Sequence, residues 1–517
     1  MPRRSILTHA RKPRVPLPGV HQPSGPPFLQ DRQQRLFLPP PAALPIFLPF
    51  FPSFFPPSHL PTRPPPQHTP KQTAHNKMGS LNPPNPDPQQ PQPQLPLRIA
   101  ILGAGIAGLS LAAALSTKSL HLAVKVYESV PAHRDVGAGL ALHRNALEAM
   151  SLLGEDLRKA YLSKAISIAA EEGEEMATRV ILGWGEYKGE VVAELGRARG
   201  RKSVSRADLL GGFLGVVEDR ERGRGVVEFG RRVGVVRVWF GDGTYTEADC
   251  VLGADGIHSV VRGYLLGEDH PAREPKNHDG WQVYRTLVST EEAKKVVDEK
   301  WTRMVPIMLG PRGHVNCIPL NKGTRLSAGV AVRGAALGEG ARKELDTRLY
   351  EDYSEDARRI VELVARDTSA SWAVADHDHA PFYCRGRVAM LGDAAHAALP
   401  FVGNGAAQAL EDAAVLDALF ARVKRKKDVG YALRAYDQVR RPRSQAVVDM
   451  ARKFGRVYAF AEGDLHEHPE KMWAFFREAA AVTNEFDVKG QNEAAVEPSF
   501  VSRTLQYSHL PLPREPS

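Results

Sequence analysis

One short stretch constrains the fold of this chain more than any other, because it joins an apolar run to a glycine-rich turn and a helix of small residues. The run 97-LRIAILGAG-105 leads into 106-IAGLSLAAAL-115, a pattern that predicts a buried strand followed by a helix. Gly103, Gly105 and Gly108 match the spacing GxGxxG. In that pattern the first glycine permits a tight turn, the second lets a pyrophosphate approach the backbone, and the third lets helix and strand pack closely.

A second apolar run, 122-LAVKVYE-128, follows and ends in an acid, Glu128, twenty residues beyond Gly108. In Rossmann-like folds a carboxylate at this distance accepts hydrogen bonds from ribose hydroxyls, and the pyrophosphate lies at the helix N-terminus. Strand, glycines, helix, strand and terminal acid in this order therefore predict a βαβ unit that binds a dinucleotide. NAD and FAD share this fingerprint, so it does not choose between them.

A second glycine-containing unit, further along the chain, favours FAD. There 386-GRVAML-391 is strand-like, Gly392 allows a sharp turn, Asp393 offers a carboxylate, and 403-GNGAA-407 opens a helix. The isoalloxazine of FAD lies on a long ribityl chain beyond the ADP half, so FAD needs an anchor from elsewhere in the chain. We expect Asp393 to bind the ribityl hydroxyls and the helix N-terminus to favour negative charge on the reduced flavin.

Composition separates the start of the chain from the rest. The net charge of +9 arises within residues 1–77, which hold ten Lys and Arg residues and one acid, so the remaining 440 residues are neutral overall. A nucleic-acid-binding surface needs basic residues clustered on the folded domain itself, and we expect none. Of the 41 prolines, 27 precede residue 98, which predicts a disordered, Pro-rich extension over residues 1–96.

The apolar stretch 36–57 of this extension does not predict a membrane span. Proline interrupts it every few residues, whereas a spanning helix needs about 20 mainly apolar ones. We expect a cytoplasmic location; the acid-poor, Arg-containing start keeps a mitochondrial transit peptide as an alternative. Another interpretation is that Met78 is the true start and that the upstream part is a gene-model artefact.

The three cysteines, Cys250, Cys317 and Cys384, are far apart and odd in number. They predict neither a disulfide framework nor a CxxC pair of the metal-binding or redox kind. A reducing compartment fits this pattern, and we expect no metal site.

Two further motifs accompany the GxGxxG unit. The segment 250-CVLGADGIHSVVR-262 contains an Asp-Gly pair, and 391-LGDAAHAALPFVGNGAAQALEDA-413 contains a Gly-Asp pair followed by the glycine-rich loop. Together with the first motif they resemble the single-component FAD-dependent aromatic hydroxylases, the family that includes salicylate hydroxylase and p-hydroxybenzoate hydroxylase. The resemblance extends from about Leu97 to about Phe460, which is most of the chain.

The resemblance implies which residues contact FAD. Asp255 and Arg262 of the Asp-Gly motif would touch both flavin and nicotinamide cofactor, and Asp393 would hold the ribityl chain. The full expected set is Gly103, Gly105, Gly108, Glu128, Gly139, Arg144, Arg206, Asp255, Arg262, Asp393, Gly403 and Ala406. Two departures, Ser205 where the family often has His and Asn404 where it often has Gln, put substrate fit in doubt more than flavin binding.

The activity implied by the resemblance is that of a group A flavoprotein monooxygenase. NAD(P)H would reduce FAD, O2 would add at flavin C4a, and the resulting hydroperoxide would hydroxylate an aromatic or phenolic substrate, salicylate-like or polyketide-like. Because such a hydroperoxide decays in water, a dry pocket is required. A base or a cation that stabilises a phenolate is also expected. The residues do not distinguish NADH from NADPH, and they give no argument for the homodimer that is common in the family.

Two other functions stay open on the residues alone. A flavin oxidase or dehydrogenase on the same scaffold would oxidise its substrate without NAD(P)H. A non-enzymatic binding module related to GDP-dissociation inhibitors would share the scaffold without flavin, although such a module has no use for Asp255 and Asp393.

We expect an α/β fold in which a Rossmann-like FAD-binding domain is interleaved with a mixed β-sheet substrate domain and followed by C-terminal helices. The whole monooxygenase domain would span residues 97–465, with a substrate layer from about 160–250 and 270–380, and residues 466–517 would form a C-terminal extension. The strand-like segments expected in the substrate layer are 281-WQVYRTLV-288, 303-RMVPIML-309 and 325-RLSAGVAV-332.

Three residues of this layer are candidates for catalysis. Tyr284 and Arg285 are neighbours in a strand, where alternation points them to opposite faces, so at most one is expected to reach the substrate ring. Arg285 is a candidate partner for a phenolate or carboxylate, with a surface ion pair as the alternative. His314, in 312-RGHVNCIPL-320, alternates with apolar neighbours and is a candidate base; a histidine satisfied inside the sheet is the alternative.

Overall fold

The structure is a computed structural model. It describes residues 96–497 apart from the gaps 120, 132–138, 168–174, 200, 219–226, 229–232, 235–237, 243, 321–322 and 335–343. Residues 1–95, which make up almost all of the expected Pro-rich extension and include Met78, lie outside the described residues, as do residues 498–517.

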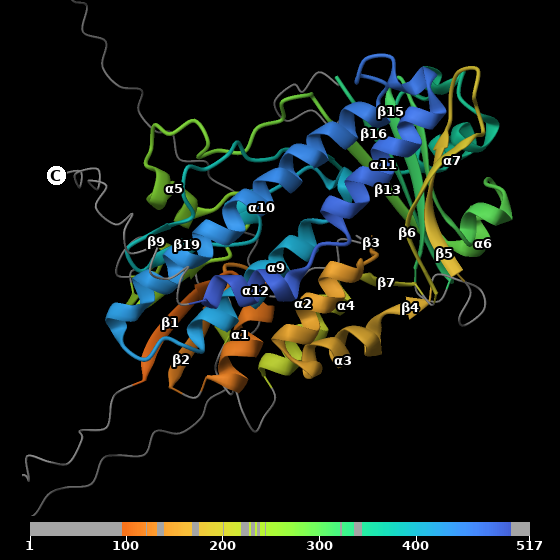
Figure 1. The fold of residues 1–517 in the computed structure, drawn as a ribbon. Helices are drawn as coiled ribbons and strands as arrows, with labels where there is room; N and C mark the ends of the chain where they lie inside the picture. Colours follow the sequence, from red (N-terminus) through yellow and green to blue (C-terminus); the bar gives the residue numbers. More distant parts are fainter. Residues whose placement is uncertain are drawn as a thin grey trace, which may run out of the picture. The chain divides into compact units, whose positions relative to one another are not determined.

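The first sheet has six strands in the order β18-β19-β12-β1-β2-β8; its strands β1, β2 and β19 are labelled in Figure 1. Its central strands are parallel, because β1 pairs in parallel with β2 on one side and with β12 on the other, and β12 pairs with β19. β1, the helix α1 and β2 thus form the βαβ unit that the sequence predicts. The strands are β1 Leu97–Leu102, β2 Leu122–Tyr127, β8 Val227–Glu228, β12 Cys250–Gly253, β18 Cys384–Arg385 and β19 Val388–Met390.

The second sheet has seven strands in the order β17-β13-β16-β15-β14-β5-β6, and all its pairs are antiparallel except β14 with β5. One face packs against α7 (Glu355–Ala365) and the other against α10 (Val429–Tyr458) and α11 (Pro469–Thr483), which gives two separate hydrophobic clusters. The strands are β5 Glu175–Leu182, β6 Val191–Arg199, β13 Gln282–Ser289, β14 Val305–Gly310, β15 Gly313–Leu320, β16 Arg325–Val332 and β17 Ser371–Ala373.

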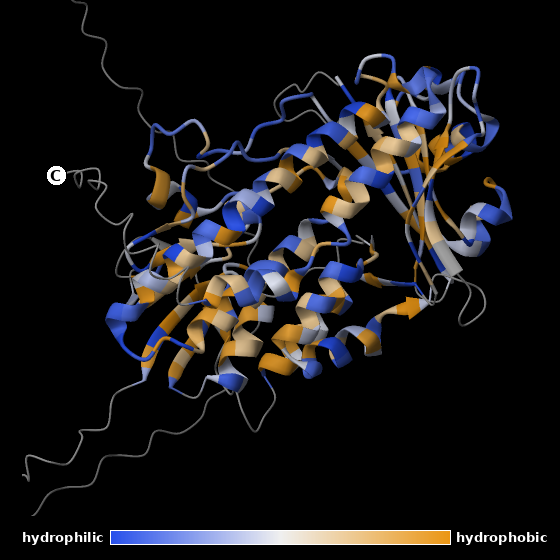
Figure 2. Ribbon diagram, in the orientation of Figure 1, coloured by the Kyte–Doolittle hydropathy of each residue, from blue (hydrophilic) through white to orange (hydrophobic). Residues whose placement is uncertain are grey.

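Helices and two small sheets complete the described part of the chain. The small sheets have the orders β3-β7-β4 and β11-β10-β9. In Figure 2, α10 carries both hydrophilic and hydrophobic turns along its length, as expected for a helix with one buried face. The remaining helices and strands are α1 Ile106–Lys118, β3 Gly139–Leu140, α2 Arg144–Leu153, α3 Glu155–Lys164, β4 Ile166–Ser167, β7 Lys202–Ser205, α4 Arg206–Val217, β9 Val233–Gly234, β10 Val238–Phe240, β11 Tyr245–Thr246, α5 Val260–Leu266, α6 Thr290–Ala293, α8 Asp393–His396, α9 Gly405–Phe420 and α12 Val488–Val496.

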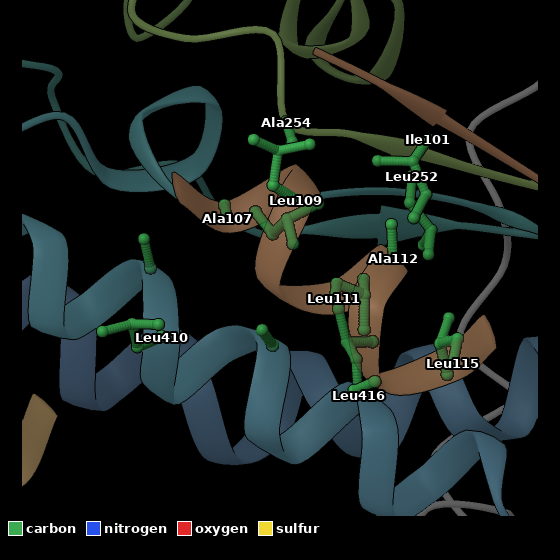
Figure 3. Close-up of a cluster of buried hydrophobic side chains, with 14 of the residues drawn as sticks. Ile101, Ala107, Leu109, Leu111, Ala112, Leu115, Leu252, Ala254, Leu410 and Leu416 are labelled. Atoms are coloured by element: carbon green, nitrogen blue, oxygen red, sulfur yellow. The ribbon is translucent and has the colours of Figure 1, made fainter. Parts of the chain in front are cut away.

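The two glycine-containing units of the sequence meet in the core between α1 and α9. Gly392, at the turn after β19, has φ +60°, and a Cβ added there would lie 2.9 Å from Cβ of Ala107 in α1 and 3.7 Å from Cβ of Ala409 in α9. Further along the same helices, Leu111 lies next to Leu416 (Figure 3). The two units are therefore neighbouring parts of one core, although about 290 residues separate them in the sequence.

Two of the expected boundaries need correction. Of the segment 160–250, only β5 and β6 belong to the seven-stranded sheet, because β8 pairs with β2 in the parallel sheet and α4 contributes to the same core as α1. Residues 466–496 are not a separate extension, since α11 packs on the seven-stranded sheet and α12 joins the α1–α9 core. Among the helices that the structure describes, none combines the length and hydrophobicity that crossing a bilayer requires.

A buried charge network joins α9 to α10. Arg440 is fully buried and donates hydrogen bonds to Glu411 Oε2 at 2.6 Å, to Asp412 Oδ1 at 2.7 Å and to Gln408 Oε1 at 2.7 Å. Burial alone would raise the pKa of Asp412, yet His396 and Arg440 together lower it to about 2. The two carboxylates are thus held charged inside the protein by the guanidinium between them.

We predict that Arg440→Met lowers the free energy of unfolding by about 3–5 kcal/mol, because it leaves two buried carboxylates without their principal partner. Urea denaturation followed by circular dichroism measures this loss. The control is Arg422→Met, which changes an exposed arginine just after α9 and should stay within about 0.5 kcal/mol of wild type. Equal stability of the two variants would show that the network is dispensable.

Candidate functional site

The first glycine loop leaves open space at the N-terminus of α1. Gly103 has φ +104°, and a Cβ there would overlap the carbonyl of Ala254 at the end of β12. At Gly105, by contrast, an added Cβ would meet no atom within 4 Å, and no described side chain caps the helix that begins there. A helix N-terminus with open space beside its first glycine suits a phosphate group.

Glu128 lies directly beside this loop, at the end of β2. Its Oε2 accepts a hydrogen bond from the Ala104 amide at 2.7 Å, and its Oε1 accepts one from the Val130 amide at 3.0 Å. The carboxylate therefore holds the loop in place while remaining partly exposed. This position fits a ribose next to the pyrophosphate.

Two carboxylates define the surroundings of the Gly-Asp turn. The carboxylate of Asp393 is exposed, and the carboxylate of Asp412 supports the turn from its buried side. Asp393, the first residue of α8, is exposed, and none of the described residues donates a hydrogen bond to its carboxylate. On the buried side, Asp412 Oδ2 accepts a hydrogen bond from the Gly392 amide at 2.7 Å and pairs with His396 Nε2 at 2.6 Å. Asp393 is therefore available to a ligand's hydroxyl groups, whereas His396 supports the turn.

The glycine-rich loop before α9 is tied to the C-terminal helices by Asn404. Its Nδ2 donates to the Thr483 carbonyl at 2.9 Å and to Asn484 Oδ1 at 3.2 Å, and its Oδ1 accepts from Gln408 at 2.8 Å. An added Cβ at Gly403 would meet no atom within 4 Å. The loop is thus fixed on its inner side and open on its outer side, where Gly403 and Ala406 were expected to contact FAD.

The Asp-Gly motif departs from the expectation of direct side-chain contact with the cofactor. Arg262 is fully buried and donates only to backbone carbonyls among the described residues. These acceptors are Ala272 at 2.6 Å, Ala394 at 3.1 Å, Ala395 at 2.9 Å and Asp378 at 2.8 Å. The structure therefore corrects the role of Arg262, which is a positioning residue that clamps the carbonyls of α8 just behind Asp393.

Asp255 also uses its carboxylate inside its own motif. Oδ2 accepts hydrogen bonds from the amides of Val260 at 2.8 Å and Val261 at 3.1 Å, and Oδ1 accepts one from the Ser259 hydroxyl at 2.5 Å. These bonds close the turn at the start of α5. A cofactor contact from this motif would therefore come from the open backbone at Gly256, where an added Cβ would meet nothing within 4 Å.

Two exposed arginines begin helices at the β3-β7-β4 sheet. Arg144 is the first residue of α2 and Arg206 the first of α4, and β3 is paired with β7 through Gly139 and Ser205. Ser205, the departure from the family pattern, caps α4 by accepting a hydrogen bond from the Asp208 amide at 3.0 Å. Gly139 packs closely against Leu320, since a Cβ there would lie 2.8 Å from Leu320 Cδ2.

The three catalytic candidates divide between the two faces of the seven-stranded sheet. Tyr284 belongs to the hydrophobic cluster on the α7 side. The structure therefore does not support the expectation that Tyr284 is a catalytic residue. Val283, its neighbour in β13, belongs to the cluster on the α10 side, and alternation puts Arg285 on that face as well. His314 joins them, because its ring contacts Phe401 and Tyr458 at centroid distances of 5.2 and 5.0 Å.

Four polar atoms on this face lack partners. Arg285 Nε, His314 Nδ1, Trp281 Nε1 and Tyr458 Oη are all buried without a hydrogen bond from any residue that the structure describes. Burial, with the Arg285 guanidinium adding to it, lowers the pKa of His314 to about 3, so the imidazole is neutral near pH 7. Buried polar groups are usually paired in native interiors, so these four atoms are candidate hydrogen-bonding partners for a ligand on this face.

Sequence reasoning missed Trp281, Phe401 and Tyr458, which surround His314. Phe401 follows the Gly-Asp turn in the motif already quoted, so its place beside the glycine-rich loop was a usable signal. No sequence signal pointed to Tyr458, because its contact with His314 depends on how α10 crosses the sheet. Gly455, one turn earlier, permits that crossing, since a Cβ there would lie 2.8 Å from the Phe401 ring.

Residues 97–451 match the family described as "FAD binding domain". The chain is 35% identical over 398 residues to a 6-methylsalicylate 1-monooxygenase of Aspergillus terreus, covering 72% of this chain and 86% of that protein. It is 30% identical over 389 residues to a salicylate hydroxylase of Pseudomonas putida, covering 70% and 86%. A solved salicylate hydroxylase substrate complex superposes with a TM-score of 0.66 at 27% identity, covering 78% of this chain and 99% of that one.

We predict that Asp393→Ala weakens FAD binding at least about tenfold, because a hydrogen bond to a charged acceptor contributes roughly 1.5–3 kcal/mol. Titration of the apoprotein with FAD, followed by flavin fluorescence, gives the dissociation constant. Asp352→Ala removes an exposed carboxylate before α7 and serves as the control with wild-type affinity. Unchanged affinity in Asp393→Ala would place the second anchor elsewhere.

A second prediction concerns the tether of the glycine-rich loop. Asn404→Ala should raise the FAD dissociation constant about tenfold while the protein still folds, because the loop loses its hydrogen bonds to the end of α11. Asn492→Ala is matched to it, since Asn492 is also a buried amide, donating to the Ala414 carbonyl at 3.1 Å, but it does not touch the loop. If both variants weaken FAD equally, the effect is general destabilisation and not positioning.

Proposed function

The chain belongs to the FAD-dependent aromatic hydroxylases, and we propose that its substrate is a small hydroxybenzoate of the salicylate type. It is an FAD-dependent monooxygenase, so the alternatives of an oxidase and of a flavin-free binding module are set aside. The substrate class is supported by the names of two relatives, a salicylate hydroxylase and a 6-methylsalicylate monooxygenase. The observation that carries the proposal is the group of unpaired polar atoms around Arg285 and His314.

The residues of the parallel sheet and its loops fit FAD. The open N-terminus of α1 at Gly105 would hold the pyrophosphate, Glu128 the ribose, and Asp393 the ribityl hydroxyls. The exposed Arg144 and Arg206 are further candidates for contact with FAD. Bound FAD supplies the redox chemistry, taking electrons from NADH or NADPH and activating O2. In this arrangement the seven-stranded sheet would be the substrate layer and the parallel sheet would carry the cofactor.

The chain's own residues prepare the substrate. Trp281, Phe401 and Tyr458 are each buried and line the face beside His314, so they would exclude water from the ring to be hydroxylated. Arg285 would bind the carboxylate and stabilise negative charge on the phenol oxygen. His314, neutral near pH 7, would accept a hydrogen bond from the phenol through Nδ1 and so increase the electron density of the ring.

We also propose the cytoplasm as the location. The three cysteines are unpaired, and two of them, Cys250 and Cys317, are buried. A reducing compartment suits such a set.

The first experiment is turnover of salicylate with FAD, NADH or NADPH, and isotopically labelled O2. We predict a product that contains one labelled oxygen atom, whether or not the carboxyl group is retained. NAD(P)H oxidation that gives only hydrogen peroxide with every hydroxybenzoate would contradict the substrate class.

Arg285→Ala should retain bound FAD but lose most of the salicylate-stimulated NAD(P)H oxidation, because the substrate carboxylate loses its cation; we expect a decrease of about tenfold or more. Tyr284→Phe is the matched control, since it changes the adjacent residue of β13 on the opposite face. Stimulation of Arg285→Ala to the wild-type rate would remove Arg285 from the site.

A further inference from the structure

Arg285 shares its face of the seven-stranded sheet with a second polar residue, Asn316. The register pairs Arg285 of β13 with Gly329 of β16, and Gly329 with Asn316 of β15. The three residues therefore form one row across three strands. Because Val283 and Ala331, two positions away along β13 and β16, belong to the cluster on the α10 side, alternation places the whole row on the face proposed to bind substrate.

The side chains of this row are more exposed than those of the neighbouring row. Ala331 and His314 of the neighbouring row are 3% and 5% exposed, whereas Arg285 and Asn316 are both partly exposed. Arg285 Nε and the hydroxyl of Ser327, which lies on the same face in β16, are buried without a partner among the described residues. The row and its surroundings thus offer hydrogen-bonding groups on the face proposed to bind substrate.

Gly329 creates room for the Asn316 side chain. A Cβ at position 329 would lie 2.7 Å from Asn316 Oδ1, and the next group it would meet, the Tyr284 carbonyl oxygen, is 3.6 Å away. The carboxamide of Asn316 therefore extends over Gly329 toward Arg285. Glycine inside a strand weakens the strand and commonly marks a close approach, and here the group that approaches is the amide.

The two polar side chains differ in what they bind. The guanidinium of Arg285 matches a carboxylate. The carboxamide of Asn316 both donates and accepts, which suits a hydroxyl group that donates one hydrogen bond and accepts another. With neighbouring strands about 4.8 Å apart, two side chains that converge over the central residue of a three-strand row can serve substituents on adjacent ring carbons. A para substituent, at the far end of the ring, would lie outside their common reach.

We propose that Asn316, extended over Gly329 beside Arg285, binds the hydroxyl group ortho to the substrate carboxylate and makes the enzyme selective for 2-hydroxybenzoates over their 3- and 4-hydroxy isomers. This inference rests on the proposed function, to which it adds a residue that determines specificity. It assigns Gly329 the steric role of admitting the amide.

The test is a binding titration that uses the absorbance change of enzyme-bound FAD. The ligands are salicylate, 3-hydroxybenzoate, 4-hydroxybenzoate and benzoate, and the proteins are wild type, Asn316→Ala, Gly329→Ala and the double variant. We expect Asn316→Ala to weaken salicylate about tenfold, the effect of one buried hydrogen bond, while benzoate affinity stays unchanged and the preference for the ortho isomer disappears.

Gly329→Ala gives a second, independent readout. Alone it should weaken salicylate, because the new methyl group displaces the amide. In the Asn316→Ala background it should have no further effect, since the clashing atom is gone and the next one is at ordinary contact distance. Such coupling is the signature of two residues acting through one contact.

Three results would overturn the inference. They are equal weakening of salicylate and benzoate by Asn316→Ala, an ortho preference that survives in that variant, and additive effects of the two substitutions. In each case wild-type turnover of salicylate would leave the proposed function intact. If instead wild type binds none of the four ligands, the proposed function itself fails, and the inference fails with it.

Discussion

The packing of α1 against α9 is the constraint on which the rest of the structure depends. Each helix begins at a glycine-containing loop, and Gly392 lies between them against Ala107 and Ala409, where any larger residue would separate the helices. The β1-β12-β19 order of the parallel sheet brings the same loops to one edge. Because the carboxyl ends of parallel strands share that edge, Glu128 and Asp393 come from distant segments to the site proposed to bind FAD.

Behind that edge, buried charges position the loops. Arg262 clamps the carbonyls of α8, Asp412 holds the Gly392 amide, and Arg440 keeps Asp412 charged. Asn404 also positions a loop, because it donates a hydrogen bond to the last residue of α11, Thr483. That helix lies beyond residues 97–451, which match the family. Buried polar groups are usually paired in native interiors. These supporting groups are paired, whereas four polar atoms around His314, on the face proposed to bind substrate, are not.

The two faces of the seven-stranded sheet determine which side chains can reach the site proposed to bind substrate. Its two faces are covered by different helices, so a shift of one residue along β13 changes the surroundings of a side chain completely. Tyr284 therefore packs against the α7 side, whereas Arg285 faces the α10 side with His314 and Asn316. Phe401, which directly precedes the glycine-rich loop, contacts His314 on the same face and so connects the proposed substrate layer to the loops proposed to bind FAD.

The sequence by itself determined the βαβ unit, the second glycine-containing unit, the mixed α/β class and the opposite facing of Tyr284 and Arg285, because spacing along a chain fixes local geometry. It did not determine which helices cover each face of β13, that Arg262 points inward to carbonyls, that α11 and α12 belong to the core, or that Gly329 admits Asn316. Those features depend on contacts between segments far apart in the chain. Only the tertiary structure decides them, since burial and hydrogen-bond satisfaction are properties of the packed whole and not of any one segment.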